Sequence, residues 1–329
     1  MKDSTIAERD AMEKHIRSIV YLILLILVLL IPKILPSNFW LYMFTLVGIY
    51  IILVASLDLL YGYTGLVSFG HAAFFAIGAY ACGILQVKAG FSFFPSFILG
   101  AIITCVSVVV IGWPLLRVRG PYFALGTLAM GLMVTIVIHN WDTLTGGVSL
   151  SGIPLPPAIN LFGWTIDFSS KATYYYFVLI FVFLTIFLIR RLTHSRLGRA
   201  LQSIRENEDL AEALGINIIY YKLVSFVIAG TMAGVAGGLY ASYMGSIEPA
   251  IGGLSFPLMV MIVVGGPHTI AGEIVGPLLL WFLPEFLEAA QVYRPLFYGL
   301  ILLVVIILMP SGIVGKLRSL SPRLAKWIP

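Results

Sequence analysis

The stretch RRLTHSRLGRALQSIRENEDLAEALGINIIYYK, residues Arg190–Lys222, is charged and amphipathic, although long apolar runs precede and follow it. Asn207 or Asp209 is a natural point for a helix to break or begin, and Gly215 is a natural helix end. Apolar residues recur between these points at near-helical spacing. The sequence therefore predicts two short helices in a compact segment, Gly198–Gly215, which we call the knob.

The knob has two possible surroundings. It is either a solvated helical segment lying at the membrane surface or a surface that contacts a soluble partner. Its apolar stripe is small, whereas a lipid anchor usually needs a broad apolar face. Its mixed charge also suits a specific protein contact better than anionic lipid. These features favour a protein partner.

The composition of the rest of the chain is that of a membrane protein. The 329 residues are 60% hydrophobic and 11% charged, whereas a soluble domain carries about 25% charged residues. The apolar runs are continuous rather than alternating, which excludes a β-barrel. We expect one all-α, polytopic transmembrane bundle in the lipid bilayer. The net charge of +5 comes from Lys and Arg beside the spans, so we expect no nucleic-acid partner.

Ten apolar segments are candidates for spans, because a helix needs about 17–25 residues to cross the hydrocarbon layer. Seven are long: Ile19–Leu35, Phe39–Leu57, Leu66–Val87, Phe93–Leu116, Tyr122–Ile138, Thr173–Ile189 and Leu223–Tyr243. Three are weaker: Phe256–Val264, Ile274–Ala290 and Leu296–Met309. The first of these three is too short to cross alone. The sequence thus predicts either ten spans or eight spans with a re-entrant hairpin.

The distribution of Lys and Arg sets the expected orientation. Their clusters fall on one side if the N-terminus is cytoplasmic. Residues 1–18, the loop 190–222 and the tail 316–329 are then cytoplasmic, and residues 19–315 form the membrane domain. The loop 140–172 is extracytoplasmic.

Glycines and buried polar groups mark two further features. Gly230, Gly234 and Gly238 give one helix a small-residue face, which predicts close packing within the chain or, alternatively, an interface with another subunit. The segment Leu60–His71 allows irregular backbone and carries polar side chains at the start of a span. Its candidate substrate-pathway residues are Tyr63, Thr64, Gly65, Ser68 and His71. The alternative, which the charge distribution favours, is an ordinary polar helix entry near the cytoplasm.

Two carboxylates lie near the ends of spans. Asp58 ends the second candidate span, where solvation or pairing at the helix end is the simpler interpretation. Glu273 either caps the following helix or lines a pathway. The span interiors are otherwise nearly free of charge.

The longest blocks of the sequence carry a family resemblance. GRALQSIRENEDLAEALGINIIYYKLVSFVIAGTMAGVAGGLYA (198–241) and LDLLYGYTGLVSFGHAAFFAIGAYA (57–81) resemble the LivM-type permease subunits of bacterial branched-chain amino-acid ABC importers. Shorter blocks at 116–129, 140–147 and 259–266 are similar to that family too. The chain departs from the family pattern at Pro267–Gly272, where a turn of the type GS-x-x-G is usual.

The resemblance implies a subunit of an ATP-driven importer in the bacterial inner membrane that works by alternating access. It implies a second, homologous permease, two ABC ATPase subunits that bind ATP and Mg, and an extracytoplasmic substrate-binding protein. The knob would sit in a groove of the ATPase. Its expected coupling residues are Gly198, Arg199, Leu201, Arg205, Glu206, Asn207, Asp209, Ala213, Leu214 and Gly215. Among these, Leu201, Ala213 and Leu214 are expected to form an apolar crest.

The chain is not expected to be an enzyme or to hold a cofactor. It has no Walker A motif, and GIVGK at 312–316 lacks the required spacing and the following Ser or Thr. Two other functions are considered. A urea or short-amide ABC permease has similar motifs. An ion-coupled secondary transporter predicts charged ion sites inside the spans.

Overall fold

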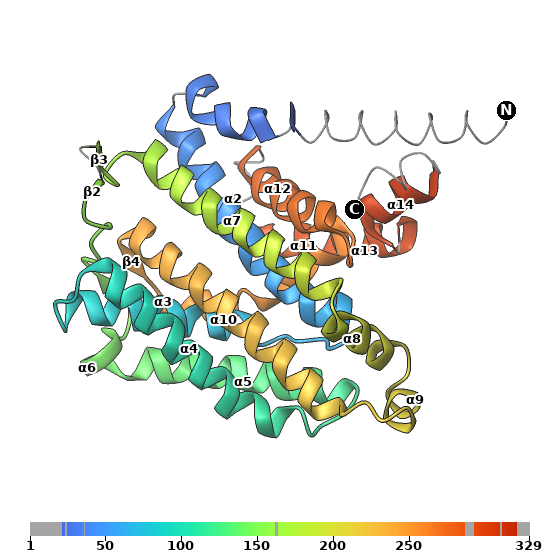
Figure 1. Cartoon of the computed structure of the whole chain (residues 1–329). Helices are drawn as coiled ribbons and strands as arrows, with labels where there is room; N and C mark the ends of the chain where they lie inside the picture. Colours follow the sequence, from blue (N-terminus) through green and yellow to red (C-terminus); the bar gives the residue numbers. More distant parts are fainter. Residues whose placement is uncertain are drawn as a thin grey trace, which may run out of the picture.

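The computed structural model describes residues 22–23, 25–35, 37–161, 164–286, 293–309 and 311–320 (Figure 1). The expected cytoplasmic segment 1–18 and residues 321–329 of the expected tail lie outside this part. The described chain is an all-α bundle of apolar helices with four short strands in its loops. The fold class of a helical membrane protein is confirmed.

The elements follow one another along the chain with short connections. After a helix at Leu25–Ile34 come α2 (Asn38–Asp58), its continuation as the π-helix η1 (Leu59–Thr64), α3 (His71–Val87), α4 (Phe93–Leu115), α5 (Pro121–Asn140), α6 (Asp142–Thr145), β1 (Leu150–Ser151), β2 (Ile159–Leu161) and β3 (Trp164–Ile166). They are followed by α7 (Lys171–Thr193), α8 (Arg196–Glu206), α9 (Glu208–Ala213), α10 (Ile218–Met244), β4 (Ser246–Ile247), the 3-10 helix η2 (Pro249–Gly253), α11 (Ser255–Gly265), α12 (Ile270–Phe286), α13 (Arg294–Leu308) and α14 (Gly312–Leu320).

Five helices in the described chain are long and apolar enough to cross a membrane, whereas the sequence predicted ten spans or eight with a re-entrant hairpin. They are Asn38–Thr64, α4, α5, α7 and α10. The other apolar helices of the described chain are shorter. In the expected span Leu66–Val87 irregular backbone is the reason: residues 66–70 are not helical, and α3 starts only at His71. Irregular backbone of this kind is tolerated at membrane depth where protein covers it.

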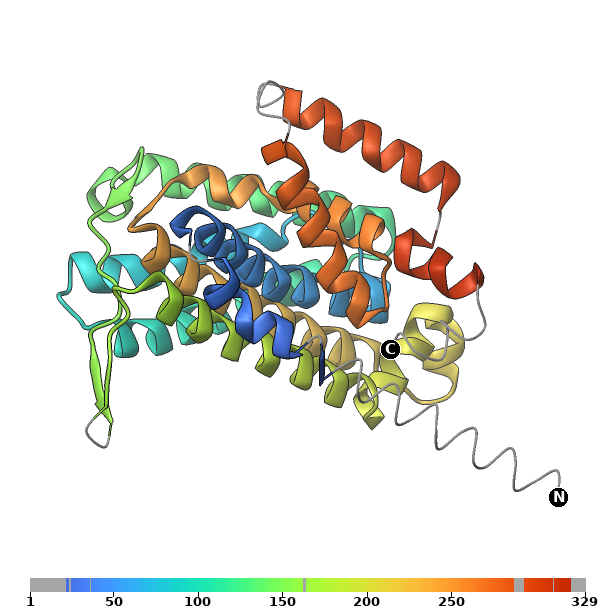
Figure 2. The same cartoon turned by 90° about the horizontal axis from the view of Figure 1, so that it is seen from above.

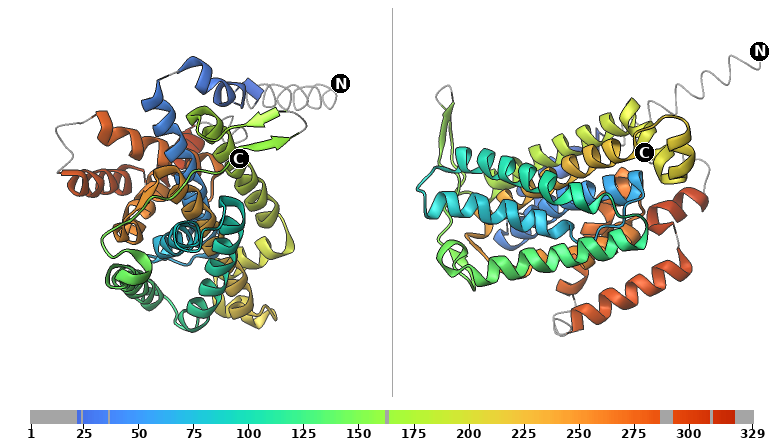
Figure 3. Two further views of the ribbon diagram at one scale, coloured as in Figure 1. Left: turned by 90° about the vertical axis from the view of Figure 1, so that its left-hand side faces the viewer. Right: turned by 90° about the horizontal axis from the view of Figure 1, so that it is seen from below.

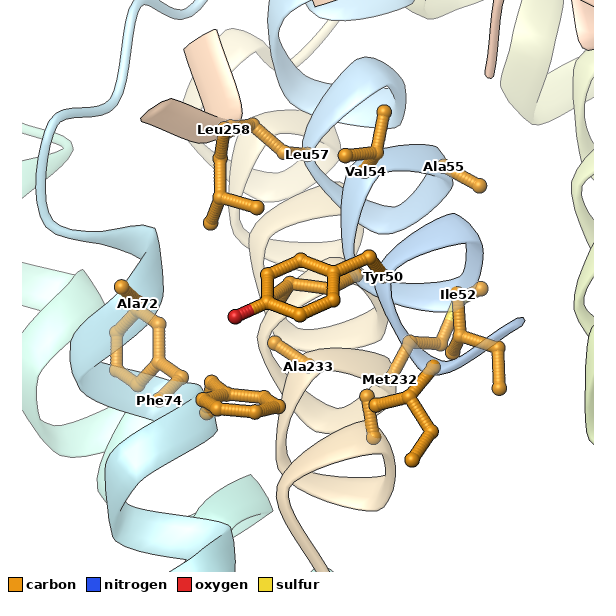
Figure 4. Close-up of a cluster of buried hydrophobic side chains, with 14 of the residues drawn as sticks. Tyr50, Ile52, Val54, Ala55, Leu57, Ala72, Phe74, Met232, Ala233 and Leu258 are labelled. Carbon is orange, nitrogen blue, oxygen red and sulfur yellow. The ribbon is translucent and has the colours of Figure 1, made fainter. Parts of the chain in front are cut away.

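Helix α2 lies at the centre of the bundle. Of its most apolar window, 89% is buried inside the chain, compared with 22% for α4. Figure 4 shows Tyr50 of α2 pointing toward Phe74 of α3, with Ala233 of α10 beside it. Leu57 and Leu258 lie where the C-terminal part of α2 packs against α11. A helix that is apolar all round is thus covered by protein, whereas α4 exposes most of its surface to the surroundings.

The glycines of α10 lie against neighbouring helices of the same chain. Gly230 faces Val108 of α4, Gly234 faces Thr104 of α4, and Gly238 faces Phe97. On the α3 side, Gly78 lies directly against the backbone of Gly234. Small residues thus let α3, α4 and α10 approach closely, which is the packing that holds apolar helices together in lipid.

The two ends of the bundle differ. Figures 2 and 3 show the β2–β3 hairpin projecting from one end and α8 and α9 from the other, which we call the knob end. Helices α11 and α12 form a separate, helical hairpin, and we name its turn, Pro267–Thr269, the hairpin tip. This tip reaches the knob end too, since His268 contacts Arg205 of α8. Helix α13 runs along the edge of the bundle.

Candidate functional site

The knob consists of α8 and α9, and local capping residues build it. The Ser195 hydroxyl accepts a hydrogen bond from Gly198 N at the start of α8. The Asn207 side chain accepts one from Leu210 N at 3.0 Å and starts α9. Gly215 ends the knob with a left-handed backbone, φ +83°. The predicted break into two short helices near Asn207 is confirmed.

The apolar crest of the knob differs from the expected one. Leu201 was expected there, but its side chain is fully buried together with Ile204 against the bundle. The expectation was wrong because helical spacing gives an apolar face without telling which side faces inward. Gly198 is buried as well, against the backbone of Thr193. Neither residue is therefore available to a partner in this conformation.

The exposed crest is formed by two leucines one turn apart. Leu214 is 73% exposed and Leu210 is 60% exposed. Leu210 was missed, although its spacing of four from Leu214 places both on one side of the helical turn. The other exposed knob residues on the expected list are Arg199, Arg205, Glu206, Asn207, Asp209, Ala213 and Gly215. The knob thus presents a small apolar ridge with charged flanks.

Ion pairs hold the knob to the bundle, and we call this set the knob clamp. Lys222 of α10 is only 3% exposed, and its Nζ lies 2.6 Å from Glu208 Oε1. Arg119, in the connection from α4 to α5, reaches Asp209 at 3.3 Å, Glu212 at 3.5 Å and Glu208 at 3.9 Å. A polar groove of about 460 Å³ lies between these residues and the start of α10.

Arg205 belongs to the inward side of the knob as well. Its Nη1 lies 3.1 Å from His268 Nδ1 at the hairpin tip, and its side-chain carbons lie beside Gly65. Partial burial and the nearby Arg205 guanidinium lower the pKa of His268 to about 4, so the imidazole is neutral at pH 7 and accepts this hydrogen bond. His268 also has a left-handed backbone, φ +63°. Arg205 therefore connects the knob to the tip.

Two carboxyl groups are buried behind the hairpin tip. Asp58 at the end of α2 is 1% exposed and Glu273 in the first turn of α12 is 2% exposed. Asp58 Oδ2 accepts a hydrogen bond of 3.0 Å from His268 N. Of the two expectations for Asp58, solvation is wrong, because α12 and the hairpin tip cover the end of α2, whereas pairing at the helix end is confirmed by this hydrogen bond. The start of α12 is capped by Thr269 rather than by Glu273, because Thr269 Oγ1 accepts a hydrogen bond from Gly272 N.

The predicted pathway residues fall into two separate groups. His71 and Ser68 are buried at the start of α3, where His71 Nε2 lies 2.8 Å from Ser56 Oγ. The start of α11 joins this group, because Ala72 N donates to Ser255 Oγ. Tyr63 instead contacts the His268 ring edge-on, with 5.1 Å between the ring centroids, and lies close to exposed Gly65. Thr64 bonds to Leu59 O and Ser225 Oγ.

A second cavity lies away from these groups. It is a cleft of about 480 Å³ lined by α3, α4, α5 and α6, including Tyr80, Met133 and Trp141. Its lining is almost entirely apolar, so it offers nothing to the charged groups of an amino acid. In the part of the chain that the structure describes, no group of three His, Cys, Asp or Glu residues is placed to hold a metal ion.

Comparison with known proteins gives the family. Residues 39–309 match the family model described as branched-chain amino acid transport system / permease component. The LivM permease proteins of Salmonella typhimurium and Escherichia coli are each 31% identical over 297 residues, covering 83% of this chain and 69% of theirs. The LivH permease protein of Escherichia coli is 28% identical, covering 83% of this chain and 93% of its own. No solved structure matches the chain. The chain therefore belongs to the family of branched-chain amino acid ABC permeases, whose members are non-catalytic transport subunits.

Proposed function

We propose that this chain is a transmembrane subunit of an ATP-driven importer that moves branched-chain amino acids into the cytoplasm by alternating access. The names of the similar LivM and LivH proteins support this substrate class. Both a LivM and a LivH protein match the chain, which supports a homologous permease as its partner. The other proposed partners are two ABC ATPases that bind Mg and ATP, and an extracytoplasmic binding protein.

The observation that carries the coupling role is the exposed ridge of the knob. Leu210 and Leu214 project from a segment that the knob clamp holds in place. Two exposed leucines flanked by Glu206 and Asp209 suit a groove in a protein better than water or lipid. The knob would follow the closure of the ATPases and pass it to the spans. Arg199, Glu206 and Asp209 would add polar contacts at the edge of this interface.

The proposed topology follows from the knob end. If the knob is cytoplasmic, so is the hairpin tip. In that case η2 and α11 together make one crossing of the bilayer toward the cytoplasm, and α12 makes the next crossing in the opposite direction. This supports ten crossings with both ends cytoplasmic in the bacterial inner membrane. The buried polar group around His71 and Ser68, where α3 and α11 both begin, is the proposed pathway element.

A substitution at the ridge tests the coupling role. Leu214→Asp should leave the chain in the membrane, because the side chain is exposed, but should abolish copurification of the ATPases and uptake of leucine. Gln202→Asp adds the same charge at an exposed position of α8 and serves as the matched control. Normal ATPase binding and uptake in Leu214→Asp would rule out the ridge as the docking surface.

Reconstitution tests the alternatives. Proteoliposomes that hold the chain, its permease partner and the ATPases should take up leucine only with ATP and the binding protein. Uptake of urea or acetamide in preference to leucine would support the short-amide permease. Uptake driven by an ion gradient without ATPases would support the secondary transporter.

A further inference from the structure

Asp58 and Glu273 form a direct carboxyl pair in the interior of the protein. Their side chains interact with each other, from α2 and from the start of α12. They are the only carboxyl groups in the described chain that are buried. Asp58 Oδ2 accepts from His268 N, whereas Asp58 Oδ1 and both Glu273 oxygens have no donor among the described residues.

Two carboxylates in such contact cannot both stay ionised. Like charges that interact directly repel strongly, and burial removes the water that would screen them. A proton on one group removes a charge and also supplies the missing donor, because a carboxylic acid O–H donates to a neighbouring carboxylate. Asp58 is the group of the two that stays ionised more readily, since it accepts a hydrogen bond from His268 N and the Arg205 guanidinium acts on it electrostatically. Glu273 is then the acid.

The surroundings of the pair supply little further charge. The titratable or charged groups that face it from the packed elements are Arg205 of α8, His268 of the hairpin tip and Tyr63 of η1, and Arg318 of α14 acts on Tyr63 in turn. Helix α11 has none, and Lys222 of α10 is paired with Glu208. One negative charge on the pair is therefore offset by the Arg205 guanidinium on the knob side.

The pair is linked to the knob through two hydrogen bonds. Arg205 Nη1 donates to His268 Nδ1 at 3.1 Å, and His268 N donates to Asp58 Oδ2 at 3.0 Å. A movement of α8 thus pulls on the hairpin tip and, through it, on the end of α2. Gly62 lies so close to the Asp58 carboxylate that a side chain there would overlap it.

From this geometry we propose that one proton shared by Asp58 and Glu273 fastens the hairpin tip to α2, and that Arg205 carries the position of the knob to this tip. The pair is a positioning device. While the proton is present, α11 and α12 move with α2 and the knob. When it is lost, two buried charges repel and the tip separates from α2.

Infrared spectroscopy of the purified chain in lipid tests the proton directly and needs no transport. We expect a C=O band of a buried protonated carboxyl at neutral pH, which disappears on alkaline titration. Glu273→Gln should remove the band and Asp58→Asn should shift it. Glu248→Gln, at an exposed glutamate of the opposite end, should leave it unchanged. Absence of the band in the unmodified chain, or a band that neither variant alters, would overturn the proposal.

The second arm concerns Arg205 and rests on the proposed function. In the assembled transporter, Arg205→Gln should lower ATP-coupled uptake about tenfold or more, because a hydrogen bond from a charged donor is lost. Arg205→Lys should restore most of it. Arg196→Gln removes the same charge from the first turn of α8 and should have little effect. Equal uptake in the two glutamine variants would contradict the role of Arg205. If no variant transports amino acids, the proposed function fails, and the infrared result still decides the state of the pair.

Discussion

The knob end holds two polar clusters that work by opposite means: the knob clamp joins the knob to the bundle, and the carboxyl pair joins the hairpin tip to α2. The knob clamp joins opposite charges, with Lys222 buried beside Glu208 and Arg119 exposed beside three carboxylates. The carboxyl pair joins two groups of like charge, Asp58 and Glu273, in the protein interior. The first is stable with all groups ionised, whereas the second requires a proton. Burial, rather than the number of charges, therefore decides how strongly the stability of each cluster depends on the loss or gain of a charge.

The largest expected effect is at the buried end of the knob clamp. Glu208→Gln leaves the Lys222 ammonium buried without a counter-charge, which we expect to cost about 3 kcal/mol or more in the free energy of unfolding. Denaturant unfolding of the purified chain, with protease cleavage at residues 207–217 as a local probe, measures this.

Two further variants sharpen that result. Glu212→Gln is the matched control, because its carboxylate is exposed and pairs with the exposed Arg119. The double variant Glu208→Gln, Lys222→Met removes both charges and should recover much of the lost stability. A single variant as stable as the control would mean that water solvates Lys222 despite its burial.

The next largest effect is at the carboxyl pair. Gly62→Ala places a methyl group where the Asp58 carboxylate lies, so the pair must shift. We expect a loss of about 1–3 kcal/mol, the usual cost of overpacking. Gly299→Ala is the control, because a side chain there meets open space. Thermal unfolding of the two variants compares them, and equal midpoints would show that Asp58 can move without cost.

How much of this end the sequence predicts depends on the distance between partners along the chain. The break at Asn207 and the stop at Gly215 were predictable, because caps act within a few residues. Asp58 and His268 lie 210 positions apart, so no local pattern joins them. Leu201 was assigned to the wrong face for a related reason: periodicity defines a face, and only packing decides which way it turns. The all-α membrane bundle was predictable from composition, but the interruption before His71 was marked only by nearby glycines.

The pH dependence of the hairpin tip is a smaller effect with a defined direction. The pKa of His268 is lowered from 6.5 to about 4 in the folded chain. The unfolded chain therefore binds the proton first, and stability falls as the pH decreases from about 6.5 toward 4. His268→Gly keeps the backbone N–H that Asp58 accepts and removes the imidazole. Unfolding midpoints measured between pH 7.5 and 4.5 should fall less steeply in this variant, and identical slopes would exclude His268 as the titrating group.

The smallest effect is expected at the exposed end of the knob clamp. Arg119→Gln breaks three ion pairs at once, but its side chain is 61% exposed and Asp209 is 86% exposed. Water and salt screen such pairs, so the loss should stay below about 1 kcal/mol. It should also disappear in about 1 M salt, where the screening length falls to about 3 Å. Unfolding at low and high salt measures this, with Arg117→Gln as the control. A large loss that persists at high salt would show that the exposed pairs hold the knob as firmly as Lys222 does.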